Sequence, residues 1–189
     1  RPAQAGAAAL AADLRAVEKR LRETSTARVE SVYGSLFGHA PGGAHCLYEG
    51  EYGPKSDVMQ PHRIADITGF YRAFGLRSAP SAAERPDHVT VECEFMHVLS
   101  CKEAHALRNG HAEGLAVCRD AQRSFVESHL ARWVPGLVRR LSADAAGTPY
   151  EPLARLLGGA VEEECRRFGL DAAREQILPP EVGAAHAAD

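Results

Sequence analysis

The feature that most constrains the fold is a helical spacing of apolar residues along most of the chain. Leu10, Leu14, Val17 and Leu21 recur at steps of three and four residues, which places them on one face of a helix. Similar stripes occupy residues 29–37, 61–74, 88–109, 112–133 and 150–168. No stretch alternates with the period of two over a useful strand length. We therefore predict an all-α fold, a single bundle of six to seven helices.

Turn residues mark the ends of these stripes. Gly38 and Gly169 follow apolar runs, as expected for residues that end helices. Pro135 is expected to bend or restart the fifth helix, because proline lacks the N–H that a helix interior uses. Thr148 is expected to be the N-cap of the last helix, with Glu151 closing a capping box.

A chain of 189 residues is long enough for one good-sized domain. Apolar residues make up 45% of it, too high a fraction for disorder. We assign residues 1–178 to a single all-α domain and expect residues 179–189, "PPEVGAAHAAD", to form a flexible C-terminal tail.

The net charge and the cysteine content limit the possible binding partners and the cellular compartment of the protein. The net charge is −3, which argues against nucleic acid as the main partner, because nucleic acid requires a basic face. The five cysteines are odd in number and include no CxxC pair, so we expect reduced thiols. No apolar run approaches the ~20 residues that cross a bilayer, and the N-terminal region has no signal-peptide core. These features predict a cytoplasmic protein without a membrane partner.

The segment "ERPDH" introduces the fourth helix with an acidic, proline-containing corner. Asp87 is suited to be the N-cap, and His88 then stands at the first helical position, where the positive end of the helix dipole favours neutral imidazole. Glu92, one turn further along the same face, could hold His88. The loop "LYEGEYG", residues 47–53, adds acids between tyrosines. Acids beside aromatic rings suit a peptide that carries Arg or Lys.

Catalytic and metal functions have weaker support. There is no GxSxG turn for a nucleophile, no P-loop and no GxGxxG. Cys93, His97, Cys101 and His105 recur every four residues on one helix, and neighbouring members could chelate zinc. One straight helix cannot complete a tetrahedral site with all four, so a second element would have to contribute. A metal-binding enzyme or sensor therefore stays open as the alternative.

Five segments, taken in order, resemble one family of proteins. They are "VYGSLFG", "LYEGEYG", "ITGFYRAFGL", "ERPDH" with "VECEFMHVLSCKE", and "SFVESHLARWVPGL". Together they resemble the TorD/DmsD/NarJ family of chaperones for molybdenum oxidoreductases, nearest to the chaperones of dimethylsulfide, ethylbenzene, chlorate and selenate oxidoreductases. One departure is that Pro86 and Asp87 are adjacent here, whereas many members place a residue between them, and Arg85 falls between Glu84 and Pro86.

The resemblance implies a TorD-like all-α fold and a non-enzymatic chaperone without a cofactor of its own. Its partner would be the apo catalytic subunit of a molybdenum oxidoreductase. It would bind that subunit's twin-arginine signal peptide or N-terminal region, assist cofactor insertion and prevent premature export. A homodimer formed by helix exchange through the connection 77–86 is also compatible with the family. We predict a peptide-binding site formed by Glu84, Pro86, Asp87, His88, Glu92, Tyr48, Glu49 and Tyr52. Tyr71 and Phe74 are further candidates for the groove or for the core. A subunit that stays in the mature oxidoreductase is a third possibility.

Overall fold

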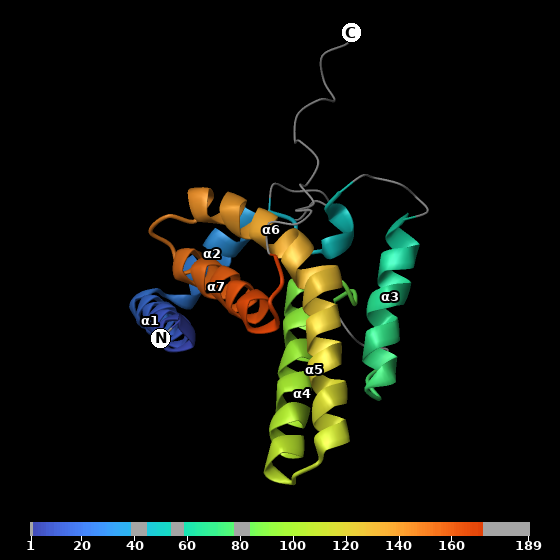
Figure 1. Cartoon of the computed structure of the whole chain (residues 1–189). Coiled ribbons are helices and arrows are strands. Elements are labelled where there is room, and N and C mark those ends of the chain that lie inside the picture. The colour runs from blue at the N-terminus through green and yellow to red at the C-terminus, as the bar shows by residue number, and fades with distance from the viewer. Residues whose placement is uncertain (1, 39–44, 54–58, 78–83, 172–189) are drawn as a thin grey trace.

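The computed structural model describes residues 2–38, 45–53, 59–77 and 84–171, with side chains from residue 6 onward in the first range and from residue 61 onward in the third (Figure 1). The α-helices are α1 (Pro2–Glu23), α2 (Thr26–Phe37), α3 (Met59–Ala73), α4 (Val89–Arg108), α5 (Ala112–Phe125), α6 (Ala131–Asp144) and α7 (Tyr150–Phe168). A 3-10 turn, η1 (Glu49–Glu51), and a π-helical turn, η2 (Val126–Leu130), complete the set. In these ranges the only β-structure is an isolated bridge between Tyr48 and His88. The all-α prediction is confirmed.

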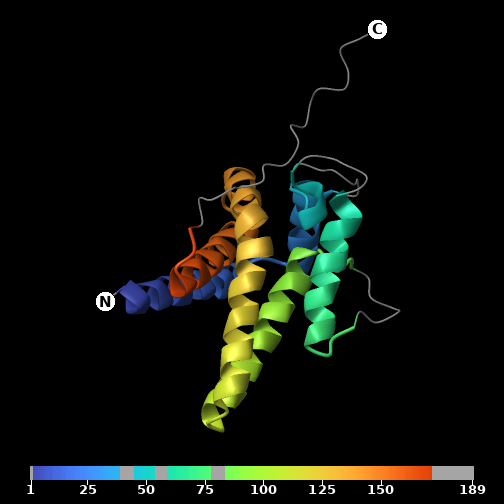
Figure 2. The same ribbon diagram turned by 45° about the vertical axis from the view of Figure 1, so that its right-hand side comes forward.

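The helices form a bundle around one long rod. Helix α5 continues through η2 into α6, and Figure 2 shows this rod running most of the height of the molecule. Helix α4 packs along α5 as the second arm of a hairpin, α7 packs on α6, and α1 packs along α7. Helix α3 packs against both α4 and α5, because the ring of Phe70 lies 6.4 Å from that of Phe95 and 5.3 Å from that of Phe125 between centroids. Within the described residues, no helix combines the length and the apolar character needed to cross a bilayer.

Aromatic side chains join α3, α4 and the rod in the core. The rings of Phe95 and Phe125 lie 4.8 Å apart between centroids, and those of Tyr71 and Phe95 lie 4.9 Å apart. Trp133 is fully buried and its ring lies 5.0 Å from that of Tyr52. Because each such side chain contributes on the order of 1.5–3 kcal/mol by leaving water, this cluster fixes the helices that carry the site.

A buried polar network ties α4, α5 and α7 together. The carboxylate of Glu103 accepts two hydrogen bonds from Arg167, at 2.7 and 2.6 Å, and one each from Arg119 and Gln122, at 2.8 Å. Burial by itself would raise the pKa of Glu103, but these hydrogen bonds outweigh it and lower the pKa to about 2. The network makes the charge of Glu103 a structural element of the bundle.

Two predicted helix ends differ in detail from the structure. Pro135 lies inside α6, and the irregular turn falls before it, in η2, where hydrogen bonds of the π type replace those of the α-helix. The last helix begins at Tyr150 with Pro149 as its N-cap, so the predicted cap, Thr148, lies one residue earlier, although its hydroxyl still accepts from Tyr150 N at 3.2 Å. The Glu151 carboxylate, however, accepts from Gly147 N at 2.7 Å rather than from Thr148 N, so the capping box is displaced by one residue.

Two expectations concern residues that the structure does not describe. The predicted C-terminal tail, residues 179–189, lies outside the described ranges. So does most of the connection 77–86 that was considered for helix exchange.

Candidate functional site

A tight turn before α4 creates the corner. Pro86 occupies the second position of a turn closed by a hydrogen bond from His88 N to Arg85 O at 3.1 Å, and its fixed φ suits that position. The hydroxyl of Tyr71, on α3, donates to Pro86 O at 2.8 Å. The turn is therefore held both by its own backbone and by the core.

The loop 45–53 is bound to this turn by backbone hydrogen bonds. Glu49 N donates to Asp87 O and Val89 N donates to Leu47 O, each at 2.9 Å. These bonds belong to the isolated antiparallel bridge between the two segments. The acidic loop and the "ERPDH" corner, which are far apart in the sequence, thus form one site.

Asp87 lies at the base of the corner, and its side chain is 0% exposed. Its carboxylate receives a fork from Arg85, with Nε to Oδ1 at 2.9 Å and Nη2 to Oδ2 at 2.6 Å. Gly50 N also donates to Oδ2, at 3.0 Å. The prediction that Asp87 caps α4 is wrong, because its carboxylate is already used by the loop and by Arg85.

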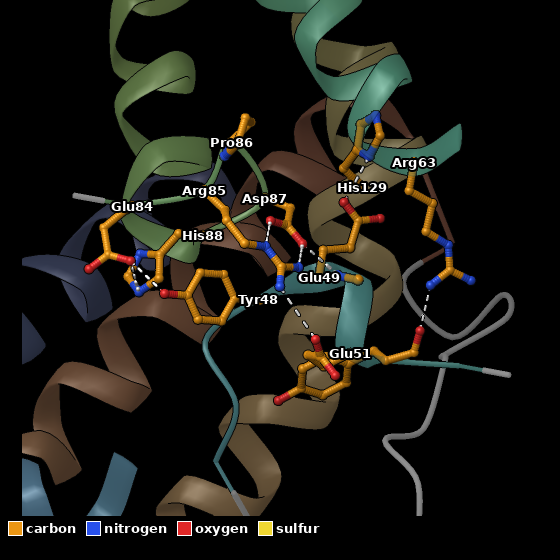
Figure 3. Close-up of polar contacts among 12 residues, drawn as sticks. Tyr48, Glu49, Glu51, Arg63, Glu84, Arg85, Pro86, Asp87, His88 and His129 are labelled. Carbon is orange, nitrogen blue, oxygen red and sulfur yellow. Dashed lines mark hydrogen bonds and ion pairs between the residues drawn. The ribbon is translucent and has the colours of Figure 1, made fainter. Parts of the chain in front are cut away.

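Arg85 fills the space between the two segments. Its Nη1 lies 3.5 Å from Glu51 Oε1, and its guanidinium carbon lies 4.6 Å from the centre of the Tyr48 ring. Figure 3 shows the guanidinium between Asp87 and Glu51, with Tyr48 alongside. The hydrogen bond to Asp87 is the main reason that the pKa of Arg85 is raised. The corner is therefore built to hold a guanidinium.

Glu84 and Tyr48 form the exposed rim of the corner. Tyr48 Oη donates to Glu84 Oε2 at 2.6 Å. This hydrogen bond and burial raise the pKa of Tyr48 to about 12. The side chain of Glu84 is 40% exposed, which makes it the acidic group here that an incoming partner reaches most directly.

His88 is the N-cap of α4. Its Nδ1 accepts from Thr90 N at 3.3 Å and lies 2.7 Å from Thr90 Oγ1. Its Nε2 lies 3.9 Å from Glu84 Oε2, and its ring meets that of Tyr48 edge-on at 4.9 Å. Burial lowers the pKa of His88, although Glu84 and Asp87 act in the opposite direction. The prediction that His88 stands at the first helical position is wrong, because α4 begins at Val89. The protonated form is disfavoured as expected, but the cause is burial.

Glu49 faces inward from the loop and pairs with η2. Its Oε2 lies 3.0 Å from His129 Nδ1, and His129 Nε2 lies 3.4 Å from Asp66 Oδ2 on α3. Both Glu49 and His129 are buried. This pair connects the loop of the candidate site to the irregular turn in the rod.

Glu92 occupies a separate buried position beneath the turn. Its Oε2 accepts from Trp133 Nε1 at 3.1 Å. Burial raises the pKa of Glu92 well above its usual value, and the nearby charge of Glu49 adds to this. The expectation that Glu92 holds His88 is wrong, because the carboxylate bonds the tryptophan of α6 instead.

The predicted site residues therefore divide into two layers. The outer layer, at the rim of the corner, contains Glu84, Tyr48, Pro86 and His88. Of these, His88 is the one that is buried, with 5% of its surface exposed. Asp87, Glu49, Tyr52 and Glu92 form the inner, buried layer. Tyr71 is buried against Phe95, and Phe74 is half-buried against the same ring, so both contribute to the core.

Two side chains that shape the site, Arg85 and Arg63, were not predicted as part of it. Arg85 stands between the selected residues Glu84 and Pro86, so its charge was the available signal. Glu51 belongs to the acidic loop that the sequence marked as suited to a basic peptide, and it lies 3.5 Å from Arg85. Arg63 donates from α3 to Tyr52 O at 2.5 Å, and nothing in the sequence marks that contact (Figure 3).

The Cys/His ridge of α4 stays a row of exposed side chains. His97 Nε2 and Cys101 Sγ lie 3.6 Å apart, and Cys93, Cys101, His97 and His105 are all exposed. Among the residues that the structure describes, no group of three or more His, Cys, Asp or Glu side chains is arranged to hold a metal ion. Within the described residues, the alternative metal function is therefore supported only by the neighbouring side chains of His97 and Cys101, which are too few to enclose a metal ion.

Three relatives illustrate the similarity to known proteins. The chain is 37% identical over 125 residues to the selenate reductase assembly chaperone protein of Thauera selenatis, which covers 65% of this chain and 61% of that protein. It is 38% identical over 102 residues to the perchlorate reductase assembly chaperone protein of Dechloromonas aromatica, covering 53% and 43%. It is 33% identical over 146 residues to the chlorate reductase assembly chaperone protein of Ideonella dechloratans, covering 75% and 70%.

The match thus spans about three fifths of the length of the first of these relatives and less than half of the length of the second. A family model described as the nitrate reductase delta subunit matches residues 2–139, which include α1 to α5, η2, most of α6 and both segments of the corner. This match confirms the resemblance carried by the five motifs: the chain belongs to the nitrate reductase delta subunit family.

Proposed function

We propose that this protein is a cytoplasmic assembly chaperone, not an enzyme, for the apo catalytic subunit of one molybdenum oxidoreductase. Its relatives from Thauera, Dechloromonas and Ideonella are named as assembly chaperones of selenate, perchlorate and chlorate reductases. The chaperone would hold the client until its cofactor is inserted and would prevent premature export.

The corner is the proposed point of contact with the client. A twin-arginine leader offers two guanidinium groups, which carboxylates bind through charge-assisted, bidentate hydrogen bonds. The observation that carries this proposal is the guanidinium of Arg85 in the fork with Asp87, beside Glu51 and the Tyr48 ring. Glu84 lies at the exposed rim, where a second arginine would meet a carboxylate.

Co-elution in size-exclusion chromatography tests the function. We expect the chaperone to form a complex with the cofactor-free catalytic subunit and to leave the cofactor-loaded subunit. Deleting the leader of the subunit should weaken the complex. A chain that stays with the loaded oxidoreductase would instead be a resident subunit, and the proposal would be wrong.

A matched pair of variants separates the corner from general acidity. Glu84→Gln removes the exposed carboxylate at the rim, and Glu113→Gln removes an exposed carboxylate at the start of α5. Glu113 lies beyond the far end of α4, roughly 30 Å from the corner at 1.5 Å per residue. We expect E84Q to weaken the complex and E113Q to leave it unchanged.

A further inference from the structure

We propose that Arg85 is an internal occupant of the client's arginine site, so that the client binds by displacing it. This inference deepens the proposed function and rests on it. The corner then holds a guanidinium in both states of the chaperone, its own when free and the client's when bound.

The contacts of Arg85 are those by which a foreign arginine would be recognised. A carboxylate fork from Asp87, a second carboxylate from Glu51 and the face of the Tyr48 ring surround one guanidinium. Asp87 is 0% exposed, whereas the side chain of Arg85 is 40% exposed. The guanidinium therefore covers a buried carboxylate and is open to solvent on its outer side, where exchange can occur.

The walls of this pocket do not depend on the side chain that fills it. Asp87 is also held by Gly50 N, and its backbone is held by Glu49 N. Tyr48 is positioned separately, by its hydrogen bond to Glu84 and by the bridge to the turn. Withdrawing the Arg85 side chain would leave the carboxylate and the ring in place.

The turn that carries Arg85 is likewise closed without its side chain. The backbone carbonyl of Arg85 accepts from His88 N, and Pro86 O accepts from Tyr71. The guanidinium can leave the pocket while the backbone that supports the corner stays bonded. The turn therefore does not need the Arg85 guanidinium in order to stay folded.

Competition from Arg85 has a measurable consequence. A ligand whose site is free for only a fraction of the time binds more weakly by that fraction. A tethered group of this kind acts at an effective concentration in the mM range. Exchange of one guanidinium for another changes few hydrogen bonds, so the client needs additional contacts, such as its second arginine with Glu84. Removing the Arg85 side chain should therefore strengthen peptide binding by about tenfold or more.

The first test uses a small probe and no client. Arg85→Ala should leave a vacant pocket above Asp87, and mM N-ethylguanidinium should raise the melting temperature of this variant. Ethylammonium is the control, because it cannot form the planar fork. Wild-type protein should respond to neither probe. Equal effects of N-ethylguanidinium on R85A and wild type would overturn the inference.

The second test measures fluorescence anisotropy with a labelled peptide that carries the consecutive arginines and apolar segment of a twin-arginine leader. We expect R85A to bind it about tenfold or more tightly than wild type. Where R85A does not fold, Arg85→Gln, which keeps an N–H donor for Asp87, should show the same direction. A folded variant that binds no more tightly than wild type overturns the inference and leaves the proposed function standing. Absence of peptide binding by both wild type and variant overturns the proposed function itself.

Discussion

Replacing Asp87 tests whether the corner is a structural unit or merely a helix start. Asp87→Ala removes both hydrogen bonds of the Arg85 fork and leaves Gly50 N without its acceptor. Loss of a helix cap alone costs ~1 kcal/mol. Each charge-assisted hydrogen bond contributes ~1.5–3 kcal/mol, and an unsatisfied buried donor costs ~1–3 kcal/mol.

The net loss is smaller than the sum of these contributions. The side chain of Arg85 is 40% exposed, so water replaces part of what Asp87 gave it. We expect D87A to lower the free energy of unfolding by about 3 kcal/mol, equivalent to ~6–12 °C in melting temperature for a chain of this length. Asp87→Asn keeps an oxygen for Gly50 N but loses the charge, so its loss should be about half as large.

Urea unfolding at pH 7, followed by far-UV circular dichroism, measures both variants against wild type. A loss of less than ~1 kcal/mol for D87A would refute this reasoning, because that is the cost of a cap alone. Confirmation would also mean that D87A is a poor probe of client binding, since it alters the fold of the corner. Glu84→Gln, at the exposed rim, is then the better variant.

Two further predictions concern ionisation. The lowered pKa of Glu103 means that its stabilising effect is complete above its usual pKa of about 4.5 and is lost as pH falls toward about 2. Glu103→Gln should therefore lower the free energy of unfolding at pH 7 by about 2–3 kcal/mol and converge with wild type near pH 2, as measured by urea unfolding across pH. The lowered pKa of His88 has the opposite origin, because burial disfavours its protonated form. The free energy of unfolding of wild type should fall as pH drops below the usual histidine pKa of about 6.5. His88→Asn keeps a capping side chain but cannot be protonated, so its free energy of unfolding should fall less over the same range. Identical pH profiles of the two proteins would contradict the role assigned to His88.

The helical architecture is readable from the sequence because it rests on local signals. The stripe of Leu10, Leu14, Val17 and Leu21 predicts one helix, and the glycine at 169 has the left-handed conformation that ends α7. The π-helical turn that contains His129 is not readable, because its register depends on packing against neighbouring helices and on Glu49, far away in the sequence.

The candidate site was only partly predictable for a similar reason. The acids and tyrosines of the two segments were selected correctly as neighbours, and the bridge between Tyr48 and His88 joins them. The partner of each group was not predictable, because long-range contacts decide it. Asp87 bonds Gly50 instead of capping α4, and Glu92 bonds Trp133 instead of His88.

The most direct measurement is a calorimetric titration of the protein with a peptide that carries the two consecutive arginines and the apolar segment of a twin-arginine leader. The same titration is made with a control peptide in which both arginines are replaced by lysines. We expect wild type to bind the arginine peptide, and to bind the lysine peptide about tenfold more weakly. Glu84→Gln should weaken binding, Glu113→Gln should not, and added salt should reduce the affinity. Equal affinity for the two peptides, together with equal affinity of the two variants, would contradict the claim that this corner recognises arginine.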